Sequence, residues 1–180
     1  MILAFDTAYS GDRAKTVCIA FHSWSDQAPT SIHSETIEGV ADYEPGQFYK
    51  RELPCILSLL KTVPQENVKA IIVDGFVVLD DTGLPGLGAH LHAALNGRVP
   101  VIGVAKTNFA TLHRLKAEVL RGASVKPLFV TAMGMPLEQG QSLFEIAPLE
   151  PMIAEVSIPE DEFRLVQVGQ TARVRLDAFP

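Results

Sequence analysis

Short apolar and β-branched runs, separated by turn-forming residues, open the chain. Residues 2–6, 15–23 and 31–38 are runs of this kind, and residues 10–12 (SGD) and 26–30 lie between them. Apolar or alternating runs bounded by Gly, Asp, Ser and Pro are typical of strands joined by turns. We therefore predict that the chain begins with three strands in an antiparallel meander.

After these runs the pattern alternates between helix and strand. Apolar residues at intervals of three and four predict a helix over residues 47–60, with a kink or a late start near Pro54. Further strands are predicted at 68–73, 99–104 and 127–131, and further helices at 87–95 and at 111–120, which Gly122 closes. This order resembles the ribonuclease H-like fold, an α/β class with a mixed sheet flanked by helices.

The composition changes near Gly140. Beyond it the chain has short β-type runs, several prolines and no pattern long enough for a sizeable helix. We predict one domain over residues 1–139 and a β-rich tail over residues 140–180.

Composition limits the class of protein. Hydrophobic residues make up 47% and charged residues 20% of the 180 residues, which is typical of a globular domain. No apolar run reaches the roughly 18 residues that a membrane span needs. The first residues lack a basic segment and contain Asp6, so we expect no signal peptide and a cytoplasmic protein. Cys18 and Cys55 have no metal-type spacing and are predicted to be buried thiols.

Three acidic residues stand where a sheet could bring them together. Asp6 and Asp74 follow apolar strands, and Glu52 lies on the helix between them. The first and fourth strands are neighbours in a ribonuclease H-like sheet, so both aspartates would share one edge. Mg²⁺ binds oxygen ligands, and metal-dependent phosphodiester hydrolysis needs converging carboxylates. Each acid alone is also compatible with a solvated carboxylate or a helix cap, although a charge beside the AIIV core needs a partner.

Other residues have both functional and structural interpretations. Lys106 ends another apolar strand and could contact a phosphate or reach solvent. Tyr43, in YEPG, could stack on a base or be a half-buried turn residue. His90 is interpreted as a packing residue or a weak phosphate contact, and His92 as a surface residue. The glycines of LPGLGAHL are compatible with a loop close to substrate or with ordinary turns.

Taken together, these motifs resemble the endonuclease V family, whose members act on deoxyinosine. The resemblance runs over residues 1–139 through FDTAY, YEPGQFYKRELP, IIVDGF, GLGAHL, VPVIGVAKT and KPLFVTAMGM. It implies a Mg²⁺-dependent endonuclease, with Mn²⁺ as a possible substitute, that cleaves DNA or RNA near a deaminated base. It also implies that Asp6, Glu52 and Asp74 bind the metal, that Lys106 is an active-site lysine, and that Tyr43 separates strands. Gly75 and His90 would then lie beside the substrate.

Two features depart from the family pattern. The segment after VDG, residues 76–87, has no basic residue, whereas the family has His-Pro-Arg there. Met135 occupies the position of a late active-site histidine, and a thioether does not bind Mg²⁺ usefully. These departures, with a net charge of −6, favour an alternative function as a catalytically impaired module that binds nucleic acid or a partner.

Two weaker resemblances concern the ends of the chain. Residues 141–180 resemble a fragment of the adaptor (membrane-fusion) proteins of type I secretion, which suggests a fusion or a misassembled piece. The opening ILAFDTAYSG also resembles the first strand of actin-like ATPases, but the sequence has no second phosphate loop. Nothing in the sequence specifies an oligomeric state.

Overall fold

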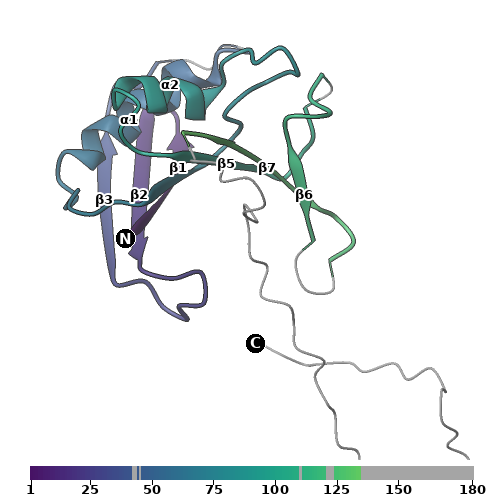
Figure 1. Ribbon diagram of the computed structural model, residues 1–180. Helices are drawn as coiled ribbons and strands as arrows, with labels where there is room; N and C mark the ends of the chain where they lie inside the picture. The colour runs from purple at the N-terminus through teal and green to yellow at the C-terminus, as the bar shows by residue number, and fades with distance from the viewer. Residues whose placement is uncertain (42–43, 45, 110, 121–123, 135–180) are drawn as a thin grey trace, which may run out of the picture. The chain divides into compact units, whose positions relative to one another are not determined.

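The computed structural model describes residues 1–41, 44, 46–109, 111–120 and 124–134 (Figure 1). Within these ranges the elements, in chain order, are β1 (Ile2–Ser10), β2 (Arg13–Phe21), β3 (Ser31–Ile37), α1 (Phe48–Leu60), β4 (Ala70–Asp74), α2 (Leu87–Ala94), β5 (Val101–Ala105), β6 (Ala117–Val119) and β7 (Leu128–Met133).

The strands of the described residues form one mixed sheet in the order β3-β2-β1-β4-β5-β7-β6. β1, β2 and β3 pair antiparallel, β1, β4 and β5 pair parallel, and β7 and β6 complete the sheet antiparallel. The predicted α/β class and the predicted adjacency of the first and fourth strands are confirmed. The parallel centre matters for function, because it brings the carboxyl ends of β1, β4 and β5 to one edge.

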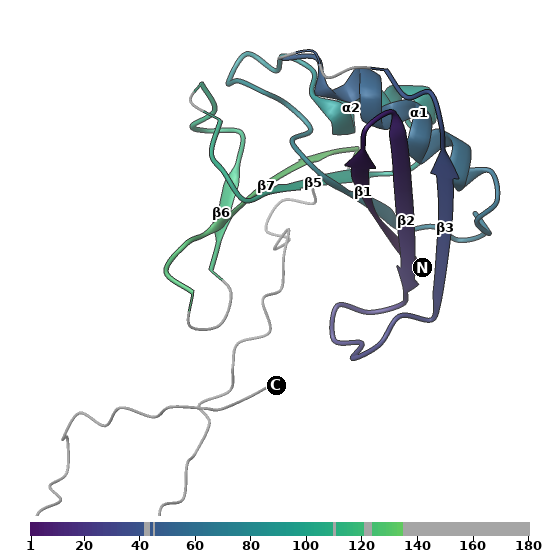
Figure 2. The ribbon, with the colours of Figure 1, turned by 180° about the vertical axis from the view of Figure 1, so that it is seen from behind.

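Both helices lie on the same face of the sheet (Figures 1 and 2). The alternation of β1 and β2 explains this, since Leu3 and Phe5 pair with Ala20 and Cys18 and all four are buried. α1 covers them with Ile56 and other apolar residues. Both predicted thiols are buried here as well.

The opposite side of the sheet, called here the open face, carries the alternate residues. Ile19 and Ile32 pair across β2 and β3 on this side, and Ile32 is 65% exposed. No helix among the described residues covers them (Figure 2). The open face also carries Asp6, because Asp6 alternates with the core-facing Phe5 along β1.

One predicted element is wrong, and one of two alternatives for another is excluded. α1 begins at Phe48 and continues through Pro54, so of the predicted kink or late start near Pro54 the late start is excluded. The predicted helix at 111–120 is a turn followed by strand β6, because Ala117, Glu118 and Val119 pair with β7. Helical spacing in that stretch is overridden by hairpin pairing, a tertiary effect that spacing does not report. Gly122 lies outside the described residues.

The chain divides into two units, Met1–Leu137 and Glu138–Pro180. All described residues belong to the first, so the β-rich tail over 140–180, its resemblance to an adaptor protein, and the boundary at residue 139 stay predictions. None of the helices in the described ranges has the length and hydropathy needed to cross a bilayer.

Candidate functional site

Asp6 and Asp74 are neighbours across two parallel strands. The register pairs Phe5 with Val73, so the two aspartates occupy the next matched positions on β1 and β4. Asp74 ends its strand as predicted, whereas Asp6 lies in the middle of β1, which continues to Ser10 because its second half pairs with β2. The sheet thus places the two carboxylates about one strand spacing apart, roughly 4.8 Å between backbones.

Glu52 approaches from the helix layer. It is only 3% exposed, although it is a charged residue on α1. Burial, together with the negative charges of Asp74 and Asp6, raises the pKa of its carboxyl to about 8. A carboxyl group whose pKa responds to both aspartates lies within electrostatic reach of both of them.

A buried polar layer that the sequence analysis did not identify surrounds Glu52. The guanidinium carbon of Arg51 lies 3.8 Å from the ring centre of Tyr9, and its Nη2 donates to the Gly11 carbonyl at 3.3 Å. The charge of Arg51 and the hydroxyl of Tyr9 both lower the pKa of Glu52, opposing the effect of burial. Within the described residues, Tyr9 Oη and Arg51 Nε are buried without a hydrogen-bond partner. The inward alternation of Tyr9 with Phe5 was the available signal.

Lys106 directly follows β5 and lies within electrostatic reach of Asp74. The pKa of Asp74 is raised by burial and by Asp6, and the Lys106 ammonium opposes that rise. Asp74 and Lys106 also line a shallow pocket of about 230 Å³ on the open face, with Ile72, Val104 and Leu128 among its walls. Asp6 and Asp74, at matched positions on neighbouring strands, are called here the acidic edge. The structure thus places Lys106 beside this edge.

The donor set fits a divalent cation by its chemistry. All three groups are carboxylates, the ligand type that Mg²⁺ prefers, and the nearly buried Glu52 lies within electrostatic reach of both aspartates. In this conformation, however, no three His, Cys, Asp or Glu side chains in the described ranges are close enough together to hold a metal ion. The metal-ligand assignment therefore stays a prediction.

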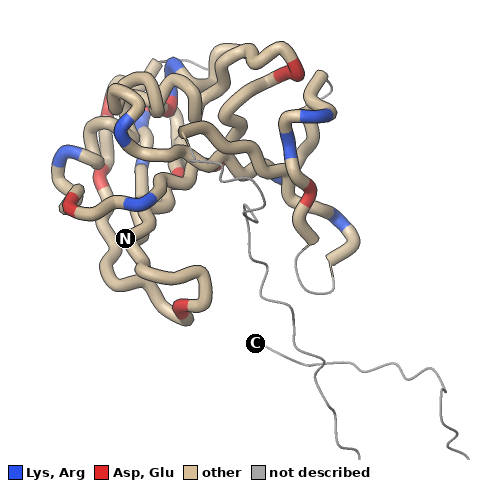
Figure 3. The backbone as a smooth tube through the Cα atoms, viewed as in Figure 1, with Lys and Arg blue, Asp and Glu red and all other residues tan. Residues whose placement is uncertain are grey.

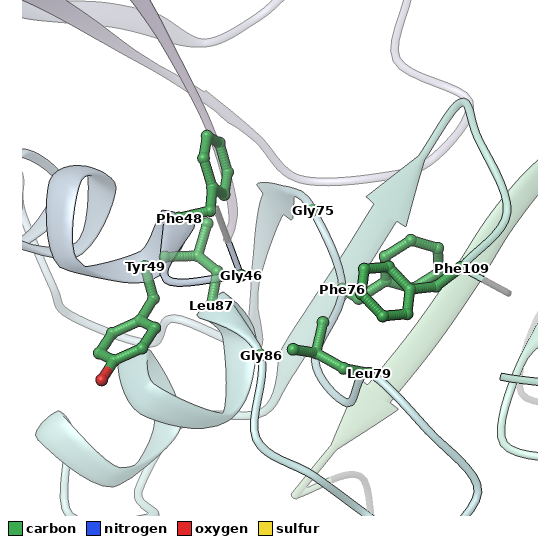
Figure 4. Close-up of a pocket in the computed structure, with 9 residues that line it drawn as sticks. All are labelled: Gly46, Phe48, Tyr49, Gly75, Phe76, Leu79, Gly86, Leu87 and Phe109. Atoms are coloured by element: carbon green, nitrogen blue, oxygen red, sulfur yellow. The ribbon is translucent and has the colours of Figure 1, made fainter. Parts of the chain in front are cut away.

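An aromatic pocket of about 220 Å³ opens directly beside the acidic edge. Gly75, the residue after Asp74, forms part of its wall (Figure 4). Figure 4 shows Phe76, Leu79 and Phe109 on one side and Phe48, Tyr49 and Leu87 on the other. Phe76 and Phe109 meet edge to face, with ring centroids 6.1 Å apart. Four aromatic rings around a cavity of this size form a surface on which a flat heterocycle could stack.

Glycine residues allow the segments around this pocket to pack closely against each other. A side chain at Gly86 would collide with the Phe76 carbonyl, and one at Gly88 would collide with Val77. The Val77 N–H donates to the buried Thr131 hydroxyl at 2.8 Å, which fixes the segment after β4 against β7. The glycines of LPGLGAHL thus allow α2 to pack closely on that segment. Of the two interpretations offered, neither anticipated this packing role.

The predictions for the remaining residues have different outcomes. His90 stacks on Tyr49 with ring centroids 3.7 Å apart, which agrees with the packing interpretation. His92 is half-buried beside Gly97 and Gly134 and is not the surface residue predicted. Tyr43 and Met135 lie outside the described residues, so the strand-separating role and the missing histidine are not tested.

Several solved endonucleases V have a fold similar to that of this chain. The Streptomyces avermitilis enzyme is 23% identical (TM-score 0.56), with 72% of this chain and 64% of that chain covered. Human ENDOV is 20% identical (TM-score 0.57), with 72% and 68% covered. The Ciona intestinalis enzyme, solved in complex with a 24mer DNA containing an inosine followed by a ribo-adenosine, is 19% identical (TM-score 0.58), with 73% and 70% covered. This chain therefore spans somewhat less than two thirds of the length of the Streptomyces protein.

These likenesses establish the fold, and the sequence itself establishes the family. No match was found among curated proteins. The family model for endonuclease V matches residues 1–146, which is most of the 180 residues. The chain belongs to the endonuclease V family.

Proposed function

We propose that this protein is a metal-dependent endonuclease that cleaves a nucleic-acid strand near a deaminated base, inosine. The observation that carries the proposal is the adjacency of two features. Asp6 and Asp74 sit side by side at the centre of the sheet, and the aromatic pocket begins at the next residue, Gly75. Two acidic groups and an aromatic pocket therefore adjoin at consecutive residues, Asp74 and Gly75, which supports a site that takes both a phosphate and a base.

Each side chain has a role consistent with its position. The carboxylates of Asp6, Glu52 and Asp74 would hold Mg²⁺, or Mn²⁺ in its place, and the bound ion supplies an activated water and neutralises the leaving oxygen. Lys106, beside Asp74, would place a positive charge near the phosphate. A cation would also relieve the repulsion that raises the pKa of Glu52 and Asp74.

The aromatic pocket would receive a base removed from the stack. Enzymes that read a single damaged or modified base commonly place it between aromatic or apolar side chains. The cavity, at about 220 Å³, is below the usual range for drug-sized ligands and is suited to a small planar group. His90, stacked on Tyr49, would stiffen one wall of this pocket.

A nicking assay tests the catalytic part of the proposal. We expect the purified protein to nick an inosine-containing oligonucleotide with Mg²⁺ or Mn²⁺ and to leave it intact with EDTA. Asp74→Asn should abolish nicking, because an amide lacks the charge that a metal site needs. Glu66→Gln is the matched control, since Glu66 is exposed in the loop between α1 and β4. Intact substrate at high protein and metal concentration would contradict the proposal.

The pocket is tested by base discrimination. Phe109 is 40% exposed, so Phe109→Ala should leave the fold stable while removing one stacking surface. We expect a higher KM for the inosine substrate, by roughly fivefold to a hundredfold if one base loses its stacking partner, with kcat less affected. Leu120→Ala, at a 63% exposed residue away from the pocket, should not change the KM.

The same experiments address the alternative of a binding module that does not cut. That function predicts nucleic-acid binding without nicking by the wild-type protein, and binding that survives Asp6→Ala. Nicking that disappears in Asp74→Asn would reject it.

A further inference from the structure

A second, basic pocket lies on the open face at the turn between β1 and β2. It encloses about 270 Å³ and is lined by Ala8, Tyr9, Ser10, Arg13, Lys15 and Thr36. The register explains how three strands build it, since Ser10 pairs with Arg13, Ala8 with Lys15, and Lys15 with Thr36. The metal centre and the base pocket described above use only Tyr9 from this set.

This basic pocket shares the open face with Asp6. Asp6 and Ala8 are two residues apart on β1 and point to the same side. Lys15 pairs with Ala8, so it stands diagonally across from Asp6 on the neighbouring strand. Diagonal neighbours of this kind lie roughly 7–8 Å apart, which is close to the separation of successive phosphates along an extended nucleic-acid strand.

The charges of this pocket leave one cation available. Arg13 pairs with Glu38 at 3.4 Å, and both side chains are largely exposed. Lys15 takes part in no ion pair or side-chain hydrogen bond within the described ranges. The hydroxyl-bearing Ser10 and Thr36 flank it. An ammonium, a guanidinium and two hydroxyl groups around a small hollow are the donors that bind a phosphate.

The surrounding surface makes such a local site necessary. Acidic and basic residues are interspersed along the backbone of the described residues (Figure 3), and the net charge of the 180 residues is −6. Affinity for a polyanion cannot come from the overall field of such a protein and depends on individual phosphate contacts.

We infer that the basic pocket around Lys15 binds a backbone phosphate of the nucleic-acid substrate, one position away from the phosphate at Asp6 and Asp74. The inference rests on the proposed function and adds a positioning site to it. Lys15 holds the strand and Arg13 assists when Glu38 releases it. Lys106, on the other side of the carboxylates, faces the phosphate to be cut, so cations flank the acidic edge from both β2 and β5.

The salt dependence of binding tests the inference. Binding of an inosine-containing oligonucleotide is measured over a range of salt concentrations with EDTA present, so that cleavage does not interfere. Lys15→Ala should reduce the slope of log K against log salt by about 0.7 for a single strand or about 0.9 for a duplex, the value for one lost phosphate contact. Lys15→Arg should keep the slope, and Lys61→Ala, on the exposed end of α1, should also keep it.

A gain of affinity provides an independent readout. Glu38→Gln removes the carboxylate that competes for Arg13 and should tighten binding, and the additional change Arg13→Gln should cancel the gain. Under cleavage conditions Lys15→Ala should raise KM and leave kcat near the wild-type value, because Lys15 holds the strand without touching the reacting atoms. A neutral methylphosphonate placed next to the cut should weaken wild-type binding and leave Lys15→Ala unaffected.

The outcomes separate this inference from the proposed function. Nicking by the wild-type protein, together with an unchanged slope and KM in Lys15→Ala, would overturn the role of the basic pocket and leave the nuclease intact. A protein that binds no nucleic acid even at low salt would overturn both.

Discussion

Replacing Glu52 by Gln should change how the stability of the protein depends on pH. The pKa of Glu52 rises from 4.5 to about 8 in the folded chain, mainly through burial and then through Asp74. The folded protein therefore keeps a proton that the unfolded chain releases near pH 4.5. Because the folded state binds more protons between these values, the free energy of unfolding falls as pH rises from about 4.5 to 8.

The size of this effect follows from the shift. The difference between 4.5 and about 8 corresponds to roughly 4 to 5 kcal/mol, since each pKa unit is worth about 1.4 kcal/mol. Most of it, about 4 kcal/mol, falls between pH 5 and pH 9. This is a large fraction of the total stability of an ordinary domain. Glu52→Gln has no group to ionise and should escape the loss. Asp74, whose pKa is also raised, contributes a loss of the same sign that both proteins share.

Urea unfolding at pH 5, 7 and 9 with EDTA measures the effect. We expect the wild-type free energy of unfolding to fall more steeply than that of Glu52→Gln, so that the variant is the more stable protein at pH 9. Glu66→Gln should follow the wild-type curve. Added Mg²⁺ should restore stability at pH 9 in the wild type but much less in Glu52→Gln, because a ligand that binds only the folded state stabilises it. Parallel pH curves for wild type and Glu52→Gln would refute the reasoning.

Three further predictions concern the supports of the site. Thr131→Val leaves the buried Val77 N–H without its acceptor, so urea unfolding should show a loss of about 1–3 kcal/mol, and an unchanged midpoint would exclude this role for the hydroxyl. Gly103→Ala forces a methyl group against the Gly75 carbonyl and Thr131, and should lower the free energy of unfolding by about 1–3 kcal/mol; a neutral result would mean that β4 and β5 can separate there. Asp81 accepts the N–H groups of residues 113–115, so Asp81→Ala should speed hydrogen exchange at those amides while exchange in β4 stays slow.

Local patterns were sufficient for most of the fold. Apolar runs located the strands to within about two residues at each end, apart from the longer β1, because burial on one or both faces requires such runs. The stretch at 111–120 failed because its spacing is helical while its partner, β7, lies about ten residues further along the chain. Asp81, some 30 residues earlier in sequence, also holds its first turn. Neither interaction is visible in a window of that length.

Part of the candidate site also followed from the sequence, and the rest required the tertiary structure. The sequence by itself determined that acidic residues follow apolar strands and that the fourth strand would lie beside the first, so Asp6, Asp74 and Lys106 could be named from pattern and resemblance. Only the tertiary structure decided that Glu52 is buried with a raised pKa, that Phe48, Phe76 and Phe109 enclose one pocket, and that Lys15 stands diagonal to Asp6. The physical reason is that burial, coupling between charges and register depend on which segments meet in space, and distances along the chain carry no record of that.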